Sequence, residues 1–315
     1  MDEGERFPQT LLEAVTYFAD RDRALRFFAE MRWPNGIICP HCGVKDDVSF
    51  ISTRRIWKCK ACRQQFSAKV GTIMEDSPLG LDKWMACIWI VVNAKNAISS
   101  YEIHRALGVR QPTAWFMLQR IRYALETQNF EKFSGMVEAD ETFVGGKEKN
   151  KHKSKKLNAG RGTVGKAVVM GLLERHTGQA RTRHIADTTK ETLHDEVRSH
   201  VEAGSALYTD THAGYKGLDT DYAHESVNHL EEYVRGAVHT NHLENYWTLF
   251  KRCYSGTWTH LSDDHLHRYL VEQEYRFNNR KDNDGGRFVG AVRQVRGKRL
   301  TYKKLIGKEE TEGEG

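Results

Sequence analysis

The sequence predicts a mixed α/β protein in which small N-terminal modules precede a larger α/β domain. Two observations support this prediction. Near the start of the chain, the cysteine pairs Cys39–Cys42 and Cys59–Cys62 interrupt helical sequence. After Gly135 the sequence changes to a series of strand-like segments followed by helices. The 315 residues are enough for two or three domains, and a hydrophobic content of 39% can supply a sizeable core.

Composition narrows the class of protein. The net charge is +6 and the pI is about 8.9, which favours a polyanionic partner. The chain contains no apolar run of about 18 residues, so we expect no membrane span. The polar, acidic N-terminus does not resemble a signal peptide. We therefore expect a cytoplasmic protein, associated with the nucleoid if its partner is DNA, whose six cysteines bind metal rather than form disulfides.

Residues 1–34 are predicted to form N-terminal helices. Apolar residues recur at helical spacing between Leu11 and Arg32, and Asp20–Asp22 would mark a turn between two short helices. The residues at this spacing are Leu12, Val15, Phe18, Leu25, Phe28 and Met31.

Residues 35–70 are predicted to form a zinc ribbon. Cys39, Cys42, Cys59 and Cys62 have the spacing C-x2-C-x16-C-x2-C, which is within the range for a four-cysteine zinc site. Each CxxC pair can occupy a tight turn and supply two thiolates to one tetrahedral ion. Because so short a module has little core, zinc would supply much of its folding energy. Four thiolates leave no open coordination position, so the zinc is expected to be structural. The alternative is a chance pair of CxxC dithiols.

Residues 78–130 are predicted to contain a helix-turn-helix-like segment. A helix over 81–93 is followed by helices over 99–107 and 112–125, and a short turn at Gly108 joins the last two. Two interpretations remain open, namely a DNA-reading pair or an ordinary helical hairpin. In the first, the residues facing DNA would be Thr113, Gln119, Arg120 and Arg122.

An α/β domain is predicted over residues 135–282. Three strands able to pair antiparallel are followed by a helix, a strand, a shorter strand and two helices, which is the order of a ribonuclease-H-like fold. The predicted elements are strands at 136–144, 166–173, 180–185, 206–210 and 222–225, and helices at 189–201, 241–253 and 263–277.

Two further segments are rich in charge. Between Lys147 and Lys166 there are eight Lys or Arg and one acid, which suits either phosphate contacts or a merely solvated loop. Residues 283–315 are expected to form a flexible tail that is first basic and then acidic. The basic residues taken as candidates for DNA contacts are Lys147, Lys149, Lys153 and Arg252.

Three acids in the α/β domain suit a catalytic metal centre. Asp140 lies in an apolar strand, where an acid is costly unless it binds something. Asp210 ends a strand, and Glu244 lies on a helix. Hard cations prefer carboxylate oxygens, and two Mg²⁺ ions about 3.5–4 Å apart can stabilise both the attacking and the leaving oxygen of phosphoryl transfer. Lys251 shares the helix face of Glu244 and could touch the DNA backbone. Glu138 shares the strand face of Asp140 and is either a helper or a decoy.

The other reactive side chains are expected to play lesser roles. The histidines of the C-terminal half are expected to lie on a polar face or contact phosphate rather than form a metal centre. Cys87 and Cys253 are expected to be core thiols. The aromatic residues next to Glu244 are expected to be core rather than base-stacking platforms; they are Tyr246, Trp247 and Phe250.

The segment from Val137 to Arg280 resembles the catalytic domain of DDE transposases of bacterial insertion sequences, in particular the branch with an N-terminal zinc ribbon. In that branch the first Asp precedes Glu-Thr, as at Asp140, and the second follows Tyr-Thr, as at Asp210. The third acid stands in the pattern T-N-x-x-E-x-x-W-x-x-x-K, which runs here from Thr240 to Lys251. Together with the ribbon, the resemblance covers most of residues 30–280.

The resemblance implies a function. It implies strand cleavage by water that depends on Mg²⁺ or Mn²⁺, followed by attack of the freed 3′-hydroxyl on target DNA. Asp140, Asp210 and Glu244 would hold two ions, and a homodimer would hold the two element ends. Some members carry Asn in place of the third acid, and Asn241 and Asn245 flank Glu244, so either type of residue could be the third ligand.

Two other functions remain as alternatives. A ribonuclease-H-like nuclease or resolvase would use the same carboxylates without strand transfer. A non-catalytic zinc-ribbon DNA-binding protein would need only the N-terminal half and would leave Asp140 without a purpose. The ribbon and the helix pair suit recognition of element ends, which favours the transposase.

Overall fold

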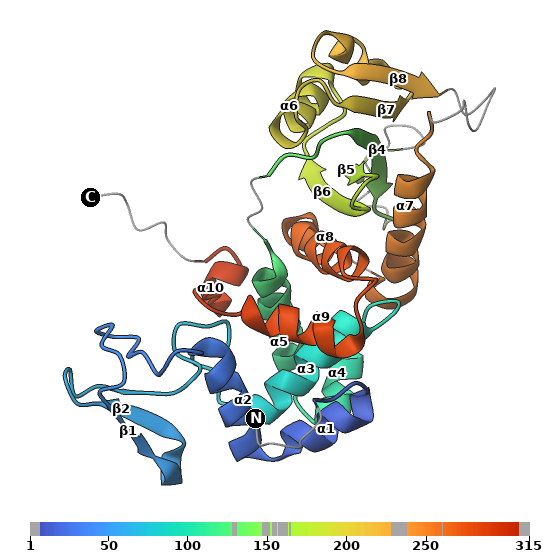
Figure 1. Ribbon diagram of the computed structural model, residues 1–315. Coiled ribbons are helices and arrows are strands. Elements are labelled where there is room, and N and C mark those ends of the chain that lie inside the picture. Colours follow the sequence, from blue (N-terminus) through green and yellow to red (C-terminus); the bar gives the residue numbers. More distant parts are fainter. Residues whose placement is uncertain are drawn as a thin grey trace. The chain divides into compact units, whose positions relative to one another are not determined.

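The computed structural model describes residues 7–127, 131–146, 165–227, 238–259 and 261–308, together with residues 152, 156 and 163 (Figure 1). The chain divides into two compact units. Unit 1 comprises Met1–Thr127 and Asn279–Gly315, and unit 2 comprises Gln128–Asn278. Along the chain, unit 2 is therefore inserted between the two parts of unit 1.

Two short helices open unit 1, as the sequence predicts. Helix α1 spans Leu11–Ala19 and begins with a capping box between Thr10 and Glu13, which satisfies the free amides of its first turn. Asp20 ends α1 and caps helix α2, Arg21–Arg32. The predicted apolar set is only partly buried: Phe18, Leu25 and Phe28 lie in the core, whereas Leu12 is 77% exposed and Val15 is 45% exposed.

The cysteine-bearing segment forms a small antiparallel sheet in the order β1-β2-β3. Trp57 of the middle strand packs between Trp33 and Phe66, with ring centroids 5.4 and 6.1 Å away, so the module has a small aromatic core. Its elements are β1 Val48–Ile51, the 3₁₀ turn η1 Ser52–Arg54, β2 Ile56–Cys59 and β3 Gln65–Phe66.

Three helices follow the ribbon close to their predicted ranges. They are α3 Leu81–Asn93, α4 Ser100–Leu107 and α5 Gln111–Leu125. Helix α3 is buried along most of its length and supplies Trp84 and Trp89 to the core. Gly108 ends α4 with a φ of 60°, a left-handed conformation that costs glycine least. The predicted pair of helices joined by a short turn is therefore present.

The prediction of a flexible tail from residue 283 is wrong for residues 283–308. This segment forms helices α9, Asp284–Arg293, and α10, Tyr302–Leu305. Phe288 of α9 is fully buried and packs against Phe18, Phe27 and Trp89. The apolar residues of this charged segment thus complete the core of unit 1, and only residues 309–315 of the predicted tail lie outside the described residues.

Unit 2 is built on a five-stranded sheet in the order β6-β5-β4-β7-β8. The first three strands along the chain pair antiparallel, and β7 and β8 run parallel to β4. This mixed sheet is consistent with the ribonuclease-H-like fold that the sequence predicts. The strands are β4 Met136–Val144, β5 Ala167–Glu174, β6 Gln179–Ile185, β7 Ala206–Asp210 and β8 Ala223–Val227.

Helices cover both faces of this sheet. Helix α6, Lys190–His200, packs Leu193 and Val197 against one face. Helix α7, Asn241–Cys253, crosses the other face, where Gly171 leaves room for Trp247 because a Cβ there would lie 2.5 Å from the indole. The remaining elements are helix α8 Asp263–Asn278, the 3₁₀ turns η4 Ala213–Tyr215 and η5 Leu218–Thr220, and the π-helical turn η6 Tyr254–Trp258.

None of the helices in the described part of the chain combines the length and the apolar character that crossing a bilayer requires.

The integration of the C-terminal segment leads to a stability prediction. Phe288→Ala should lower the free energy of unfolding of unit 1 by about 3–5 kcal/mol, because it opens a cavity in an aromatic core. Denaturant unfolding followed by circular dichroism measures the change. Tyr101→Ala is the matched control, since Tyr101 is 62% exposed, and it should shift stability by less than about 0.5 kcal/mol. Equal midpoints for the two variants would contradict the docking of α9.

Candidate functional site

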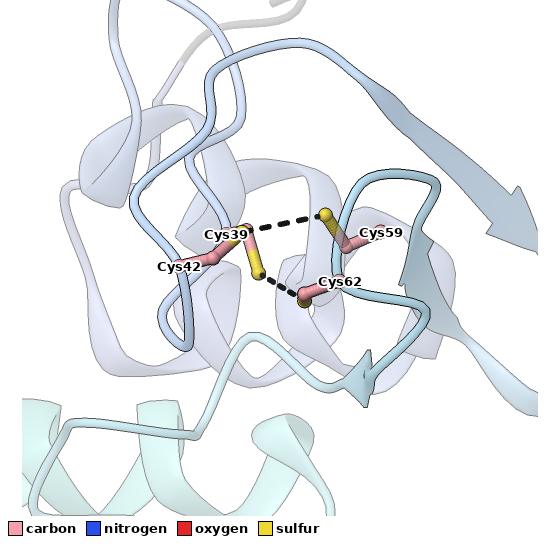
Figure 2. A group of neighbouring side chains, drawn as sticks. All are labelled: Cys39, Cys42, Cys59 and Cys62. Atoms are coloured by element: carbon pink, nitrogen blue, oxygen red, sulfur yellow. Dashed lines mark hydrogen bonds between the residues drawn. The ribbon is translucent and has the colours of Figure 1, made fainter.

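The four predicted zinc ligands converge at one point. Figure 2 shows Cys39 and Cys42 from one turn facing Cys59 and Cys62 from the other. Cys39 Sγ lies 3.7 Å from Cys62 Sγ, and Cys42 Sγ lies 3.6 Å from Cys59 Sγ. Four Zn–S bonds of about 2.3 Å in a tetrahedron would set the sulfur atoms about 3.8 Å apart. The cluster therefore fits a structural zinc ion.

Local hydrogen bonding favours the thiolate form of Cys39, which is the form that binds zinc. For Cys42 and Cys62 a backbone hydrogen bond lowers the pKa, but burial and the neighbouring thiols outweigh it and raise the pKa. Although burial by itself would raise the pKa of Cys39, hydrogen bonds from the backbone amides of Cys42 and His41 and from neighbouring thiols lower that pKa to about 7. A thiolate is the species that binds metal. The turn geometry thus prepares at least this ligand for the ion.

Asp140 and Asp210 project from neighbouring strands of unit 2. Strands β4 and β7 pair in parallel as far as Glu138 and Tyr208. Asp140 and Asp210 each lie two residues beyond this last pair, and they are close enough for the charge of Asp210 to raise the pKa of Asp140. Because side chains alternate between faces along a strand, both carboxylates then lie on one face. Asp210 is also the last residue of β7, and the carboxyl ends of parallel strands are where α/β sheets bind ligands.

The raised pKa of Asp140 shows that negative charge is concentrated around this carboxylate. Burial, followed by the charges of Glu141 and Asp210, raises the pKa of Asp140 from 3.8 to about 7. The indole Nε1 of Trp247 donates to Asp140 Oδ2 at 3.0 Å and opposes this rise. Among the described residues, neither Asp140 nor Asp210 forms an ion pair with a basic side chain. A divalent cation would supply the missing positive charge, so these residues fit the Mg²⁺ or Mn²⁺ that the sequence implies.

Glu141 is a member of this site that the sequence analysis did not single out. Its carboxylate accepts a hydrogen bond from the Tyr215 hydroxyl at 2.6 Å and lies 3.6 Å from His212 Nδ1. The backbone amide of His212 in turn donates to Asp210 Oδ1 at 2.9 Å. Glu141 therefore ties β4 to the loop that carries Asp210. Its position directly after Asp140 was the only sequence signal, because its partner Tyr215 is remote in the chain.

Glu244 and Lys251 both lie on α7, as predicted. Glu244 is half-buried and Lys251 is exposed. Trp247, one turn beyond Glu244, contacts Asp140, so α7 lies over the face that carries Asp140. Within the described residues, however, Glu244 does not join the two aspartates in a cluster of ligand atoms within 4.8 Å of one another. The structure thus brings Asp140 and Asp210 together and places Glu244 on the adjacent helix.

A second group of metal-type ligands does form, and no sequence pattern had indicated it. One ligand atom from each of Glu138, His239 and His242 lies within 4.8 Å of the others. Glu138 is fully buried, and the Arg175 guanidinium Nε donates to its Oε1 at 2.7 Å. The sequence predicted that these histidines lie on a polar face or contact phosphate, and no local pattern connected them with Glu138.

Three of the four residues expected to face DNA from the helix pair are buried, so that expectation is wrong for them. Gln119 is 0% exposed, Arg120 is 6% exposed and Arg122 is 1% exposed. Arg120 donates to the carbonyls of Glu75 and Leu300 and stacks on Phe116, which is a packing role. Thr113 is half-buried and Arg252 is exposed. The other predicted DNA contacts, Lys147, Lys149 and Lys153, lie outside the described residues.

Comparison with known proteins agrees with the family resemblance seen in the sequence. A family model described as an ISXO2-like transposase domain matches residues 132–278. A second model, described as a transposase zinc-ribbon domain, matches residues 20–65. The two matches cover the sheet that carries the aspartates and the four-cysteine module.

Two curated proteins are similar over much of their own length. One is an uncharacterized protein in transposable element ISH50 of Halobacterium salinarum, which is 29% identical over 269 residues, covering 81% of this chain and 90% of that protein. The other is an uncharacterized transposase-like protein of Haemophilus influenzae, which is 30% identical over 96 residues, covering 30% of this chain and 77% of that protein. A solved simian T-cell lymphotropic virus intasome in complex with PP2A regulatory subunit B56 gamma aligns with a TM-score of only 0.28 and 11% identity, over 55% of this chain and 63% of that chain.

The cysteine geometry predicts a zinc requirement. Cys59→Ser should remove the zinc ion, because three thiolates cannot complete the tetrahedron, and should lower the thermal stability of unit 1. Metal analysis of the purified protein and circular dichroism measure the two effects. Cys253→Ala, at a buried thiol of unit 2, is the control and should retain zinc. Full zinc content in Cys59→Ser would contradict the assignment.

The charge concentration at Asp140 predicts a pH-dependent effect on stability. The folded state binds the Asp140 proton more tightly than the unfolded chain, so stability falls as the pH rises from 3.8 to about 7. Without added divalent ions, Asp140→Asn should therefore stabilise unit 2 at pH 8 but not at pH 4. The gain is on the order of 4 kcal/mol, because the pKa difference is about 3 and each pKa unit corresponds to about 1.4 kcal/mol.

Thermal unfolding at the two pH values measures this gain. Added Mn²⁺ should raise the midpoint of the wild type more than that of Asp140→Asn, since ligand binding stabilises the folded state. Asp195→Asn, at an exposed position of α6, should leave the midpoint unchanged. A pH-independent effect of Asp140→Asn would contradict the charge argument.

Proposed function

This chain belongs to the ISXO2-like transposase family, and we propose that it binds the terminal repeats of an insertion sequence and transfers the cleaved strand into target DNA. The proposed chemistry is metal-dependent cleavage followed by 3′-hydroxyl attack. The observation that carries this proposal is the placement of Asp140 and Asp210 on adjacent parallel strands, where burial and the charges of Glu141 and Asp210 raise the pKa of Asp140 to about 7.

In the proposed reaction the metal ions and the side chains of the protein have different roles. Two bound divalent ions would stabilise the attacking and leaving oxygens of an in-line displacement. Asp140, within β4, and Asp210, at the end of β7, would hold the ions, and Glu244 or a flanking Asn on α7 would complete their ligands. Trp247, through its hydrogen bond to Asp140 Oδ2, would fix the orientation of that carboxylate. Lys251, exposed on α7, would contact the DNA backbone near the ions.

The proposed surface for terminal-repeat DNA lies in unit 1. A cavity of about 400 Å³ is lined by residues of α2, the ribbon and the segment before α3. Its charged lining residues are all basic, namely Arg21, Arg54, Arg55 and Lys69. Basic side chains in a concave surface favour phosphate contacts. We place the DNA backbone here and retain Thr113, at the start of α5, as a candidate for base contact.

Assembly follows from the reaction. Two element ends must be joined to one target, so two active sites must work together, and we propose a homodimer in the synaptic complex. Each copy would contribute one pair of aspartates and one zinc ribbon.

A strand-transfer assay tests the proposal. Wild-type protein incubated with labelled terminal-end DNA in Mg²⁺ or Mn²⁺ should give joined product. Asp210→Asn should lower its rate at least about a hundredfold, because losing a metal ligand removes several kcal/mol of charge stabilisation. Asp219→Asn, at an exposed position on the same segment, is the control and should act as the wild type.

The other outcomes of this assay are informative. Cleavage without joining would indicate the nuclease or resolvase. Binding without cleavage would indicate a non-catalytic DNA-binding protein. Equal activity of Asp210→Asn and wild type would show that the chemistry occurs elsewhere.

A further inference from the structure

Glu138 lies two residues before Asp140 in β4 and carries a carboxylate that is completely buried. A buried charge is tolerated only when it is paired and hydrogen-bonded. Arg175 Nε donates to Glu138 Oε1 at 2.7 Å, and His242 Nδ1 lies 2.7 Å from the same oxygen. The backbone amide of Leu243 donates to Oε2 at 3.0 Å. Both oxygens are thus engaged, and two of the three partners belong to α7.

The contact with Leu243 replaces a missing helix cap. Leu243 is in the first turn of α7, where backbone amides have no partner within the helix. Thr240, at the N-cap position, makes no side-chain capping bond. The Glu138 carboxylate takes this role from a different element, and its negative charge suits the positive end of the helix dipole. The start of α7 is therefore attached to β4 rather than capped by its own residues.

Arg175 holds the other side of the same junction. It directly follows β5 and is almost completely buried at 10% side-chain exposure. One of its terminal nitrogens donates to the His239 carbonyl at 2.6 Å and to His239 Nδ1 at 3.0 Å. Its guanidinium also stacks on Tyr208 of β7, 4.6 Å from the ring centroid. Arg175 therefore neutralises Glu138 and connects β4, β5 and β7 to the residues that lead into α7.

The same cluster has the donor set of a metal site, but its contacts favour a clamp. A metal would need Glu138, His239 and His242 as ligands. Arg175 already lies within hydrogen-bonding distance of two of these three side chains. A divalent ion placed there would face a fixed guanidinium charge. The positive charge that Glu138 requires is supplied by the chain itself.

We propose that Glu138 is a positioning residue that fixes the start of α7 against β4 and so sets Glu244 and Trp247 against Asp140. Glu244 directly follows Leu243, the residue that Glu138 holds, and Trp247 is one turn further on. A misplacement of about 1 Å in a reacting group can cost roughly a hundredfold in rate. This inference rests on the proposed function only for its catalytic consequence, because the clamp is a property of the fold.

Glu138→Gln tests the clamp directly. Glutamine has nearly the same shape, but its amide nitrogen cannot accept hydrogen bonds, and the Arg175 charge loses its partner. Amide hydrogen exchange followed by mass spectrometry should show faster exchange in a peptide covering 241–247, with peptides of β5 and α6 unchanged. This readout does not depend on catalysis.

The same variant should separate binding from chemistry. Its cleavage rate on labelled terminal-end DNA should fall at least about tenfold, as expected for a displaced catalytic group. Its dissociation constant for that DNA should stay within about twofold of the wild type, since the ribbon and the helix pair are untouched. The concentration of Mn²⁺ that gives half-maximal cleavage should rise, because Glu244 is less well placed.

Two further variants distinguish loss of the clamp from unfolding of the protein. His242→Ala removes one contact of a side chain that is 57% exposed and leaves the Arg175 and Leu243 contacts in place. It should fold and show the same changes at smaller size. Thr248→Ala, at an exposed position of α7, is the matched control and should behave as the wild type in both assays.

Several results would overturn the proposal. Unchanged exchange over 241–247 in Glu138→Gln would do so, whatever the cleavage result. A Glu138→Gln variant that unfolds, combined with a His242→Ala variant identical to the wild type, would reduce Glu138 to a core residue. A transition-metal ion bound beyond the ribbon zinc and lost in His242→Ala would show a metal site instead. If wild-type protein cleaves nothing, the proposed function fails, and the exchange result alone decides the clamp.

Discussion

Unit 2 depends on the way in which one strand accommodates three carboxylates. Strand β4 carries Glu138, Asp140 and Glu141. The three carboxylates are compensated to different degrees by hydrogen bonds and opposite charge. Glu138 has a full set of partners in Arg175, His242 and the Leu243 amide. Glu141 is held by the Tyr215 hydroxyl. Asp140 has the indole of Trp247 but no cation among the described residues. The two glutamates therefore hold the flanking elements in place, and the remaining uncompensated charge is concentrated at Asp140, a residue of the proposed metal site.

Much of the fold could be predicted from the sequence because its signals are local. Period-2 and period-3.6 apolar patterns place the strands and helices of unit 2 within about a residue or two of their observed ends. The tail is the exception. Its Lys, Arg and Gly content suggests disorder, yet Phe288 and Leu300 are buried to within 1% exposure. The partners of Phe288 are Phe18, Phe27 and Trp89, which lie 199 to 270 residues earlier in the chain, and no pattern within the tail reveals them.

The site residues also fall into those that local sequence signals predict and those that only the fold reveals. The convergence of the four cysteines could be predicted because their motif is short and the chemistry of thiolates is specific, whereas metal binding by the aspartates stays a prediction. The prediction that Gln119, Arg120 and Arg122 face DNA was wrong because it assumed that polar residues of a helix lie at the surface. A long side chain can instead be buried when backbone carbonyls satisfy its donors, as those of Glu75 and Leu300 do for Arg120. The partnerships of Glu138 with α7 and of Glu141 with Tyr215 connect residues that are 74 or more positions apart, so only the fold reveals them.

The order of the two units along the chain adds a constraint on function. The ribbon, the helix pair and the basic cavity all precede unit 2, but the aromatic core that supports them is completed by Phe288, which follows it. A chain that stops within unit 2 contains every proposed DNA-binding residue of unit 1 but lacks α9. The core around Phe18, Phe27 and Trp89 is then left open to water, which costs stability in proportion to the apolar surface exposed. The proposed DNA-binding unit therefore reaches its full stability only in a chain that also contains α9, which follows unit 2.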